Sequence, residues 1–285
     1  MTKLDKTFYE EILAKDFYNM ILFVRLIIDL LQATLFFAVS SSLYSTEYKK
    51  TPGFQLYVGP EIYHVHRKKE SGSKQDGMVY AVHAGYDRIE RYKFYFGFDA
   101  LYGEGVLSGK NRANDCLRSN FSDTYAEGRL GYTLQSKCRW RPQLTPYFGL
   151  GYFIEKNDFT HPKEMPFHFK TTYLYAVAGF LSQLKLTDRL DVGFNFKFKY
   201  PYNVNCRASH DPLQNDFTQG VKEKPHYRVE LPLTYRCFEN SDHLRVSLIP
   251  FYELRRYGYH PNFPCDFLET RLDIYGIQIK LMYYL

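Results

Sequence analysis

The sequence has little of what marks several common classes of protein. It holds a single Trp and only 5 Cys, and neither sign of charge dominates: 37 Lys and Arg stand against 31 Asp and Glu, for a net charge of +6. This mild balance comes without a basic stripe of interleaved aromatic residues, which argues against a nucleic-acid partner. The mean hydropathy of −0.41 excludes a bundle of membrane-spanning helices.

Aromatic residues, by contrast, are abundant. The 285 residues include 27 Tyr and 24 Phe, and aromatic residues make up 18% of the chain. A soluble domain rarely needs so many amphipathic rings, whereas a membrane barrel places them in girdles at the two membrane surfaces. A negative mean hydropathy fits a barrel, because half of each strand faces away from lipid.

The N-terminal part of the chain, residues 1–52, differs from the rest. Residues 20–39 are strongly apolar and are followed by small residues, which is typical of a secretory signal peptide cleaved near residues 38–45. The alternative is a retained transmembrane helix in which Arg25 and Asp29 pair one turn apart. Two charges within a span are costly, so the sequence favours a signal peptide and leader over residues 1–52 and a mature domain over residues 53–285.

The last eleven residues, 275–285, alternate strictly between two kinds of side chain. Successive side chains of a strand point to opposite faces, so this pattern predicts one apolar, aromatic face and one more polar face. Roughly 9–11 residues suffice for a tilted strand to cross a bilayer. The sequence therefore predicts a lipid-facing strand of a transmembrane β-barrel. The apolar face holds Tyr275, Ile277, Ile279, Leu281, Tyr283 and Leu285, and the other holds Gly276, Gln278, Lys280, Met282 and Tyr284.

The same two-residue period recurs from residue 53 onward and predicts about ten strands. The third, over residues 92–103, is the clearest, whereas the sixth, over 169–185, has no clear phase because part of it is apolar on both faces. Proline removes a ladder donor, so prolines within the pattern are expected at bulges or strand ends. The expected strands start near residues 54, 80, 92, 126, 146, 169, 192, 227, 244 and 275, and the prolines in question are Pro146, Pro232 and Pro250.

The expected connections alternate between short and long. This alternation is typical of outer-membrane barrels, with short turns in the periplasm and long loops outside. The alternative is a soluble β-sandwich or lipocalin-like barrel, in which the apolar face would pack against a core or cavity. The length of the aromatic runs and the terminal strand favour the membrane. Short links fall near 89–91, 136–143, 187–189 and 237–243, and longer polar ones cover 67–77, 104–120, 156–167, 203–225 and 258–270.

In these patterns the chain resembles the small bacterial outer-membrane β-barrel proteins, the OmpA-type and porin-like barrels of about eight to ten strands. The resemblance covers residues 53–285. It implies an all-β, antiparallel up-and-down transmembrane barrel in the bacterial outer membrane, in contact with outer-membrane lipid. It also implies that Tyr275 to Leu285 is the signal read by the barrel-assembly machinery, although Leu285 stands where such barrels usually end in Phe.

Charges of both signs lie on the polar faces of the expected strands and are candidates to line the lumen. A ten-stranded barrel is barely wider than its own side chains, and buried charges need partners. The sequence therefore favours a salt-bridged plug. The alternative is a narrow pore, whose cationic excess predicts a preference for anions. The lumen candidates are Lys93, Asp99, Glu127, Arg129, Glu155, Lys197, Lys199, Arg228, Glu230, Arg245, Glu253 and Lys280.

The outer loops offer candidates for contact with other molecules. The aromatic segment 257–267 is the strongest, since rigid rings make good anchors; its contact candidates are Tyr257, Tyr259, His260 and Phe263. Some ten-stranded barrels are outer-membrane proteases, but the pair His210-Asp211 does not reproduce their acidic–x–histidine spacing. His64 and His66 with His83 or His260 are too weak a set to predict a metal, and we expect no cofactor.

The five cysteines are candidates for disulfides, because both compartments that this topology reaches are oxidising. Cys116, Cys206 and Cys265 are expected in outer loops, and Cys138 and Cys237 in periplasmic turns. One outer cysteine would stay unpaired and available to crosslink another envelope protein. The alternative, of equal weight, is that the cysteines are free thiols without a role.

The sequence thus predicts a non-enzymatic outer-membrane barrel with an envelope-structural or surface-interaction role through its outer loops. A narrow anion-preferring porin is the second hypothesis, and an outer-membrane protease is a more distant third.

Overall fold

The fold was analysed in a computed structural model. The structure describes residues 53–135, 142–162, 167–210, 215–238, 243–258 and 269–285, so the predicted leader over 1–52 lies outside the described residues. No helix long and apolar enough to cross a membrane occurs in these ranges.

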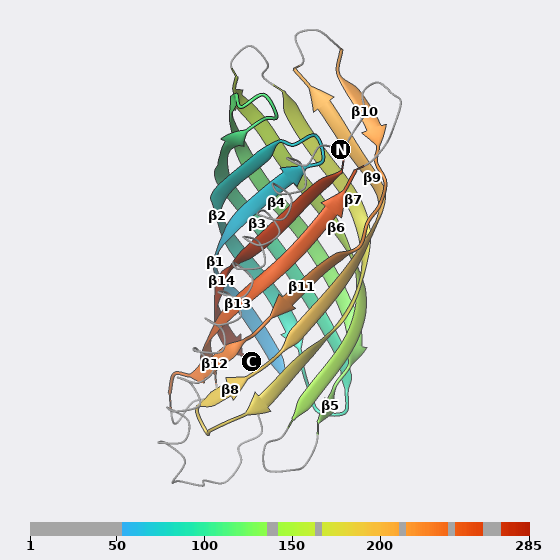
Figure 1. The fold of residues 1–285 in the computed structure, drawn as a ribbon. Coiled ribbons are helices and arrows are strands. Elements are labelled where there is room, and N and C mark those ends of the chain that lie inside the picture. The colour runs from blue at the N-terminus through green and yellow to red at the C-terminus, as the bar shows by residue number, and fades with distance from the viewer. Residues whose placement is uncertain (1–52, 136–141, 163–166, 211–214, 239–242, 259–268) are drawn as a thin grey trace, which may run out of the picture. The chain divides into compact units, whose positions relative to one another are not determined.

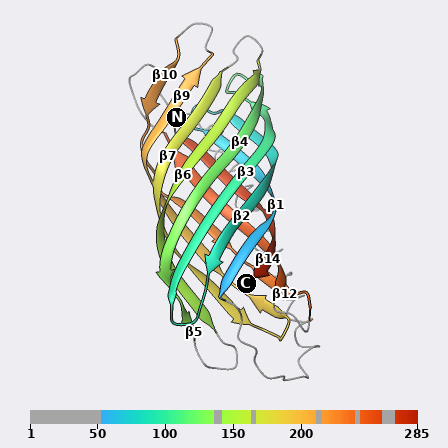
Figure 2. The ribbon, with the colours of Figure 1, turned by 180° about the vertical axis from the view of Figure 1, so that it is seen from behind.

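The described chain is all β and forms one antiparallel sheet that closes on itself into a ten-span barrel (Figures 1 and 2). The predicted fold is confirmed. Its strands are β1 (Phe54–Lys69), β2 (Lys74–Arg88), β3 (Phe94–Lys110), β4 (Cys116–Tyr132), β5 (Leu134–Gln135), β6 (Gln143–His161), β7 (His168–Lys185), β8 (Leu190–Val192), β9 (Asn195–Ser209), β10 (Phe217–Gly220), β11 (His226–Glu230), β12 (Leu233–Arg236), β13 (Leu244–Tyr257) and β14 (Thr270–Tyr284).

Fourteen strands make ten spans because some spans are interrupted. β8 and β9 are parts of one span, broken at Gly193 and Phe194, and β11 and β12 are parts of the next, broken at Leu231 and Pro232. The two breaks face each other, since Gly193 N donates to the Pro232 carbonyl at 2.8 Å. Pro232 itself has no N–H to give to the ladder, as expected for a proline at a strand break. β14 pairs with both β1 and β13 and so closes the barrel.

The outward faces of the strands are apolar over most of their length. On β3 and β6 the outward side chains Phe94, Phe148 and Leu150 are 78%, 66% and 63% exposed. On β14, Ile277, Ile279 and Leu281 continue the same surface. Meanwhile the inward faces carry the buried polar and charged residues. A barrel that is apolar outside and polar inside is inverted relative to a soluble one, as a membrane-spanning barrel requires.

Towards the end that holds the β1–β2 connection, the outward faces become polar while the strands continue. β3 runs on through Glu104 and Ser108, and β6 through Lys156, all of them exposed. The chain was expected to form long loops here, at 67–77 and 104–120. Instead β1 ends at Lys69 and β2 begins at Lys74, and much of the second segment is also strand. The barrel therefore extends beyond its apolar band, and we call this part the outer half.

The phase of the sixth span, left open by the sequence, is set by its neighbours. In β7 the side chains of Tyr173, Tyr175 and Val177 are buried in the barrel, whereas those of Leu174 and Ala176 face outward. The rings of the inward tyrosines are large, and each needs space above the neighbouring strand. Glycine on the neighbouring strand provides that space.

Gly151 on β6 lies beneath the ring of Tyr175 on the paired strand β7. A Cβ at Gly151 would come within 2.3 Å of Tyr175 Cζ, and the Tyr175 hydroxyl donates to Glu127 at 3.0 Å. Outward-facing Gly128 has no atom within 4 Å of the same built Cβ. Only the inward glycine is needed for packing.

We expect Gly151→Ala to lower the free energy of unfolding by about 1–3 kcal/mol, because the added methyl must displace Tyr175 from Glu127. Gly128→Ala should be neutral or stabilise by up to about 1 kcal/mol, since it only restricts the unfolded chain. Urea unfolding of both variants in lipid vesicles measures the difference. Equal stabilities would show that Tyr175 does not depend on this glycine.

Candidate functional site

The lumen is the site that the sequence singled out, and its centre is a buried ion-pair cluster around Arg228 of β11. The guanidinium binds Glu61 of β1 through two nitrogens, at 3.1 and 3.2 Å. It also donates to Glu230 at 2.8 Å and to Glu253 at 3.2 Å, and it stacks on Phe251 with 3.8 Å between the guanidinium carbon and the ring centroid. Every carboxylate in the cluster is thus paired, as buried charges require.

A second cluster surrounds Asp99 of β3. Its carboxylate accepts hydrogen bonds from the hydroxyl of Tyr57 at 2.6 Å and from Lys197 at 3.3 Å, and it contacts His83. Lys197 also pairs with Glu127 at 3.5 Å. Asp99 and Lys197 lie on β3 and β9, on distant sides of the barrel, so this cluster spans the lumen.

Contacts between opposite walls recur further along the barrel. Arg255 on β13 reaches Asp123 on β4, halfway around the ring, with nitrogen–oxygen distances of 2.7 and 2.9 Å. The hydroxyl of Tyr63 on β1 donates to the same carboxylate at 3.0 Å. Nearer the outer end, Tyr257 on β13 contacts Glu155 on β6. Side chains therefore bridge the lumen at several levels.

The interior of the outer half combines apolar and polar side chains, and the buried polar ones include Arg67, Gln75, Asn157, Thr171 and Gln219. Phe153 stacks on Tyr173 with ring centroids 4.6 Å apart. Large side chains from around the wall complete this outer core, and they are almost without solvent exposure: Val65, Leu107, Phe121, Phe153, Phe251, Leu272 and Ile274. Buried side chains of both kinds fill this part of the barrel, so the outer half closes the lumen.

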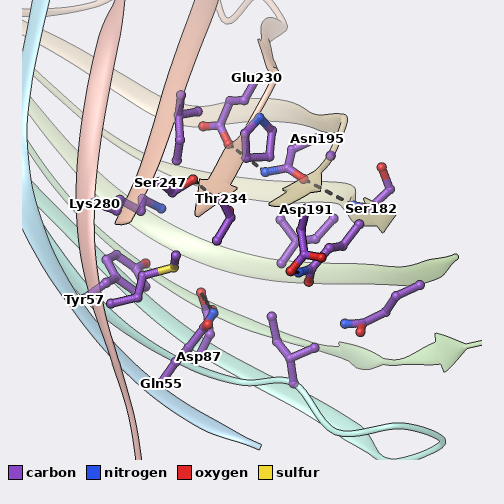
Figure 3. Close-up of a pocket in the computed structure, with 18 of the residues that line it drawn as sticks. Gln55, Tyr57, Asp87, Ser182, Asp191, Asn195, Glu230, Thr234, Ser247 and Lys280 are labelled. Atoms are coloured by element: carbon purple, nitrogen blue, oxygen red, sulfur yellow. Dashed lines mark hydrogen bonds between the residues drawn. The ribbon is translucent and has the colours of Figure 1, made fainter. Parts of the chain in front are cut away.

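At the opposite end, which holds the short turns, the lumen contains a cavity of about 100 Å³. Figure 3 shows its wall: Tyr57, Asp87 and Gln55 on one side, and Asn195, Asp191 and Glu230 on the other, with the amino group of Lys280 pointing inward. The break between β8 and β9 and the break at Pro232 both border it. We call it the turn-end cavity.

Most of the predicted lumen residues lie inside the barrel. Buried there are Asp99, Glu127, Arg129, Glu155, Lys197, Lys199, Arg228, Glu230, Arg245 and Glu253, and Lys280 is half-buried on the cavity wall. Lys93 does not lie there. Its side chain is 53% exposed and pairs with Glu90 in the β2–β3 turn, because β3 begins only at Phe94.

Sequence reasoning missed several titratable residues of the interior, among them Glu61, His83, Asp87 and Asp123. The signal for them was present. Alternation places them on the faces opposite the lipid-facing residues of β1, β2 and β4. Carrying the alternation three residues past Val58 on β1 would have found Glu61, which the Arg228 cluster needs.

Tyr257 was predicted to be a contact residue in an outer loop, and this prediction is wrong. It is the last residue of β13, 1% exposed, and its ring lies inside the barrel. A loop was expected to begin at this residue, but β13 continues to it, and the alternation of the strand turns the Tyr257 side chain inward. Tyr259, His260 and Phe263 lie outside the described residues.

The cysteines also differ from expectation. Cys206 was expected in an outer loop, but it lies in β9 with its side chain buried beside Thr171, in the outer half beyond the apolar band. Burial raises the pKa of the Cys206 thiol to about 11. Cys116 is exposed at the start of β4, and Cys116, Cys206 and Cys237 are free thiols in the described chain. Cys138 and Cys265 lie outside the described residues.

We expect thiol labelling at pH 8 to modify Cys116 and to leave Cys206 unmodified. A thiol whose pKa is near 11 is ionised at pH 8 in only about one molecule per thousand, and burial blocks access as well. Mass spectrometry of the labelled peptides gives the result, and unfolding in denaturant before labelling should make both cysteines react. Labelling of Cys206 in the folded barrel at the rate of Cys116 would contradict its placement.

The histidines do not gather into the metal set considered above. His64 stacks on Tyr275, with ring centroids 5.0 Å apart, and so lies on the outer surface, whereas His83 points inward to Asp99. In the ranges that the structure covers, no group of three or more His, Cys, Asp or Glu could hold a metal ion. At the outer rim, His210 packs its ring against His168, which pairs with Asp158 at 3.1 Å; Asp211 lies outside the described residues.

An all-β antiparallel barrel with a lipid-facing exterior and a polar interior is the fold of the small bacterial outer-membrane β-barrels, and this chain has that fold. This fold agrees with the outer-membrane location that the sequence predicted. No protein-family profile matches the sequence, and no curated protein matches it.

Solved structures do match. The outer membrane protease OmpT from Escherichia coli aligns with 85% of this chain and 100% of its own length, with a TM-score of 0.54 and 12% identity. The translocator domain of the autotransporter NalP from Neisseria meningitidis covers 90% of this chain and 96% of its own length, at a TM-score of 0.46 and 10% identity. At 12% identity the likeness to OmpT establishes the fold and not the activity.

Proposed function

We propose that this chain is a non-conducting outer-membrane barrel that presents its outer half as an interaction surface for other envelope or extracellular molecules. The observation that carries the proposal is the filled lumen. Charged clusters bridge it within the apolar band, and closely packed apolar and polar side chains fill it in the outer half. Contacts with other macromolecules then have to be made outside the lumen.

The narrow anion-preferring porin is the less favoured alternative. A pore would require the cations of the lumen to face water, yet Arg228 and Arg255 are held by carboxylates and stacked on Phe251 and Phe153. A catalytic role is also less favoured. The rim pair His168 and His210 contact each other ring to ring, which is a poor arrangement for activating a nucleophile.

The exterior fits the partners that the sequence suggested. The exposed tyrosines at the ends of the apolar band, such as Tyr80, Tyr102 and Tyr283, would form the aromatic girdles against outer-membrane lipid. β14 carries the terminal signal for the barrel-assembly machinery. Above the band, exposed charged residues such as Lys156 and Glu104 give the outer half a polar surface suited to protein contact.

A photoreactive amino acid on β6 tests the interaction surface in cells that carry the full chain. At Lys156, in the outer half, irradiation should yield covalent adducts with other proteins. At Leu150, on the same strand and face but within the apolar band, it should yield lipid adducts alone. Absence of protein adducts at Lys156 and at Ser108 on β3 would contradict the proposal.

A further inference from the structure

The turn-end cavity is lined by one cation that has no direct ion pair among the described residues, Lys280 on β14. Among the described residues Lys280 makes no ion pair or hydrogen bond; its Nζ lies 4.2 Å from the ring centroid of Tyr57, and it lines the cavity. One face of the ammonium thus contacts an aromatic ring, and the rest faces the cavity (Figure 3).

The other charges on the wall are paired. Arg129 binds Asp87 at 3.3 Å, Lys197 binds Asp99 at 3.3 Å, Glu230 binds Arg228 at 2.8 Å and Asp191 binds Arg245 at 3.1 Å. The carboxylates that face the cavity therefore have cationic partners of their own. Asp87, Asp99 and Glu230 act on the Lys280 ammonium through their charges, but none of them makes an ion pair or hydrogen bond with it. Its N–H donors are therefore open to a negatively charged ligand in the cavity.

The position beside Lys280 also offers a hydrogen-bond donor. Ser247 on β13 is directly paired with Lys280 in the ladder and lines the same cavity. Its oxygen accepts a hydrogen bond from Thr234 at 3.0 Å, which leaves its own hydroxyl hydrogen free to donate. An ammonium and a hydroxyl side by side are a common pair for binding an oxyanion.

We propose that the turn-end cavity binds a small oxyanion, with Lys280 Nζ as its charged anchor and the Ser247 hydroxyl as a second donor. The volume of about 100 Å³ limits the ligand, since a cavity of roughly 150 Å³ holds benzene. The ligand class is therefore inorganic phosphate, sulfate or a short carboxylate. It enters from the turn end, because the Arg228 cluster and the outer core close the other side.

Titration calorimetry with inorganic phosphate tests the site on the full chain folded in a zwitterionic detergent, at constant ionic strength. The original protein should bind phosphate, and Lys280→Gln should weaken binding by at least about tenfold, since one charge-assisted contact is lost. Lys93→Gln removes an exposed lysine of the same charge and should bind as the original does. Constant ionic strength and this control separate binding from general salt effects.

Ser247→Ala supplies a second test that leaves the charge in place, and it should weaken binding several-fold. Folding of each variant is checked by its heat-dependent electrophoretic mobility. The proposal is overturned if neither phosphate nor acetate binds to the folded barrel, or if Lys280→Gln and Ser247→Ala both bind phosphate as tightly as the original. Neither result would affect the proposed interaction surface, which the crosslinking at Lys156 tests separately.

Discussion

Replacing Arg228 with alanine is expected to lower the free energy of unfolding by about 3–5 kcal/mol. The guanidinium is 2% exposed and is the shared partner of Glu61, Glu230 and Glu253. Without Arg228, three buried carboxylates lose the cation that they share and repel one another. The loss should appear as a lower urea midpoint for the barrel folded in lipid vesicles, with secondary structure intact below that midpoint.

Arg88→Ala is the matched control for this experiment. Arg88 also pairs with a carboxylate, that of Glu90 at 2.9 Å, but its side chain is 38% exposed. An exposed pair contributes at most about 1 kcal/mol, so this variant should unfold almost as the original does. If Arg228→Ala lost no more than Arg88→Ala, the interior carboxylates would be solvated, and the lumen would hold water where we describe a filled core.

The second large effect concerns the exterior. Ala126→Arg on β4 is expected to lower the free energy of unfolding by about 1–3 kcal/mol, because Ala126 faces outward within the apolar band. An arginine there brings its charge against hydrocarbon. Unfolding from vesicles of defined thickness measures the cost.

Asn120→Arg on the same strand and face provides the comparison. Asn120 is exposed in the outer half and pairs in the ladder with Asp158, so an arginine there should change the stability by less than about 1 kcal/mol. Equal costs at residues 120 and 126 would mean that the apolar band is not where the structure puts it. A larger cost at 120 would place the membrane over the outer half.

The architecture could be predicted from the sequence because the strand period is enforced by the backbone. Side chains two apart share a face, so Phe94, Phe96 and Phe98 had to face one medium and Asp99 the other. The same alternation assigned Arg129, Lys197 and Arg228 to the interior before any contact was known. It would have assigned Glu61 as well, had the phase of β1 been carried past Val58.

Alternation says nothing about where a strand ends or what lies across the lumen. Polar residues such as Glu104 and Ser108 read as loop, yet they belong to β3, because a strand in water can be polar outside if its inner face is packed. The partner of Arg255 is Asp123, 132 residues away in sequence. That pairing depends on the closure and stagger of the barrel, which no single strand encodes. Tyr257 and Cys206 were placed in loops for the same reason.

Single-channel recording in a planar bilayer tests the filled lumen most directly. The full barrel, shown to be inserted and folded, should give no conductance steps, because side chains from opposite walls meet at the Arg228, Asp99 and Asp123 clusters. Stable, anion-selective steps from the unmodified barrel would contradict the account and would make the chain a porin.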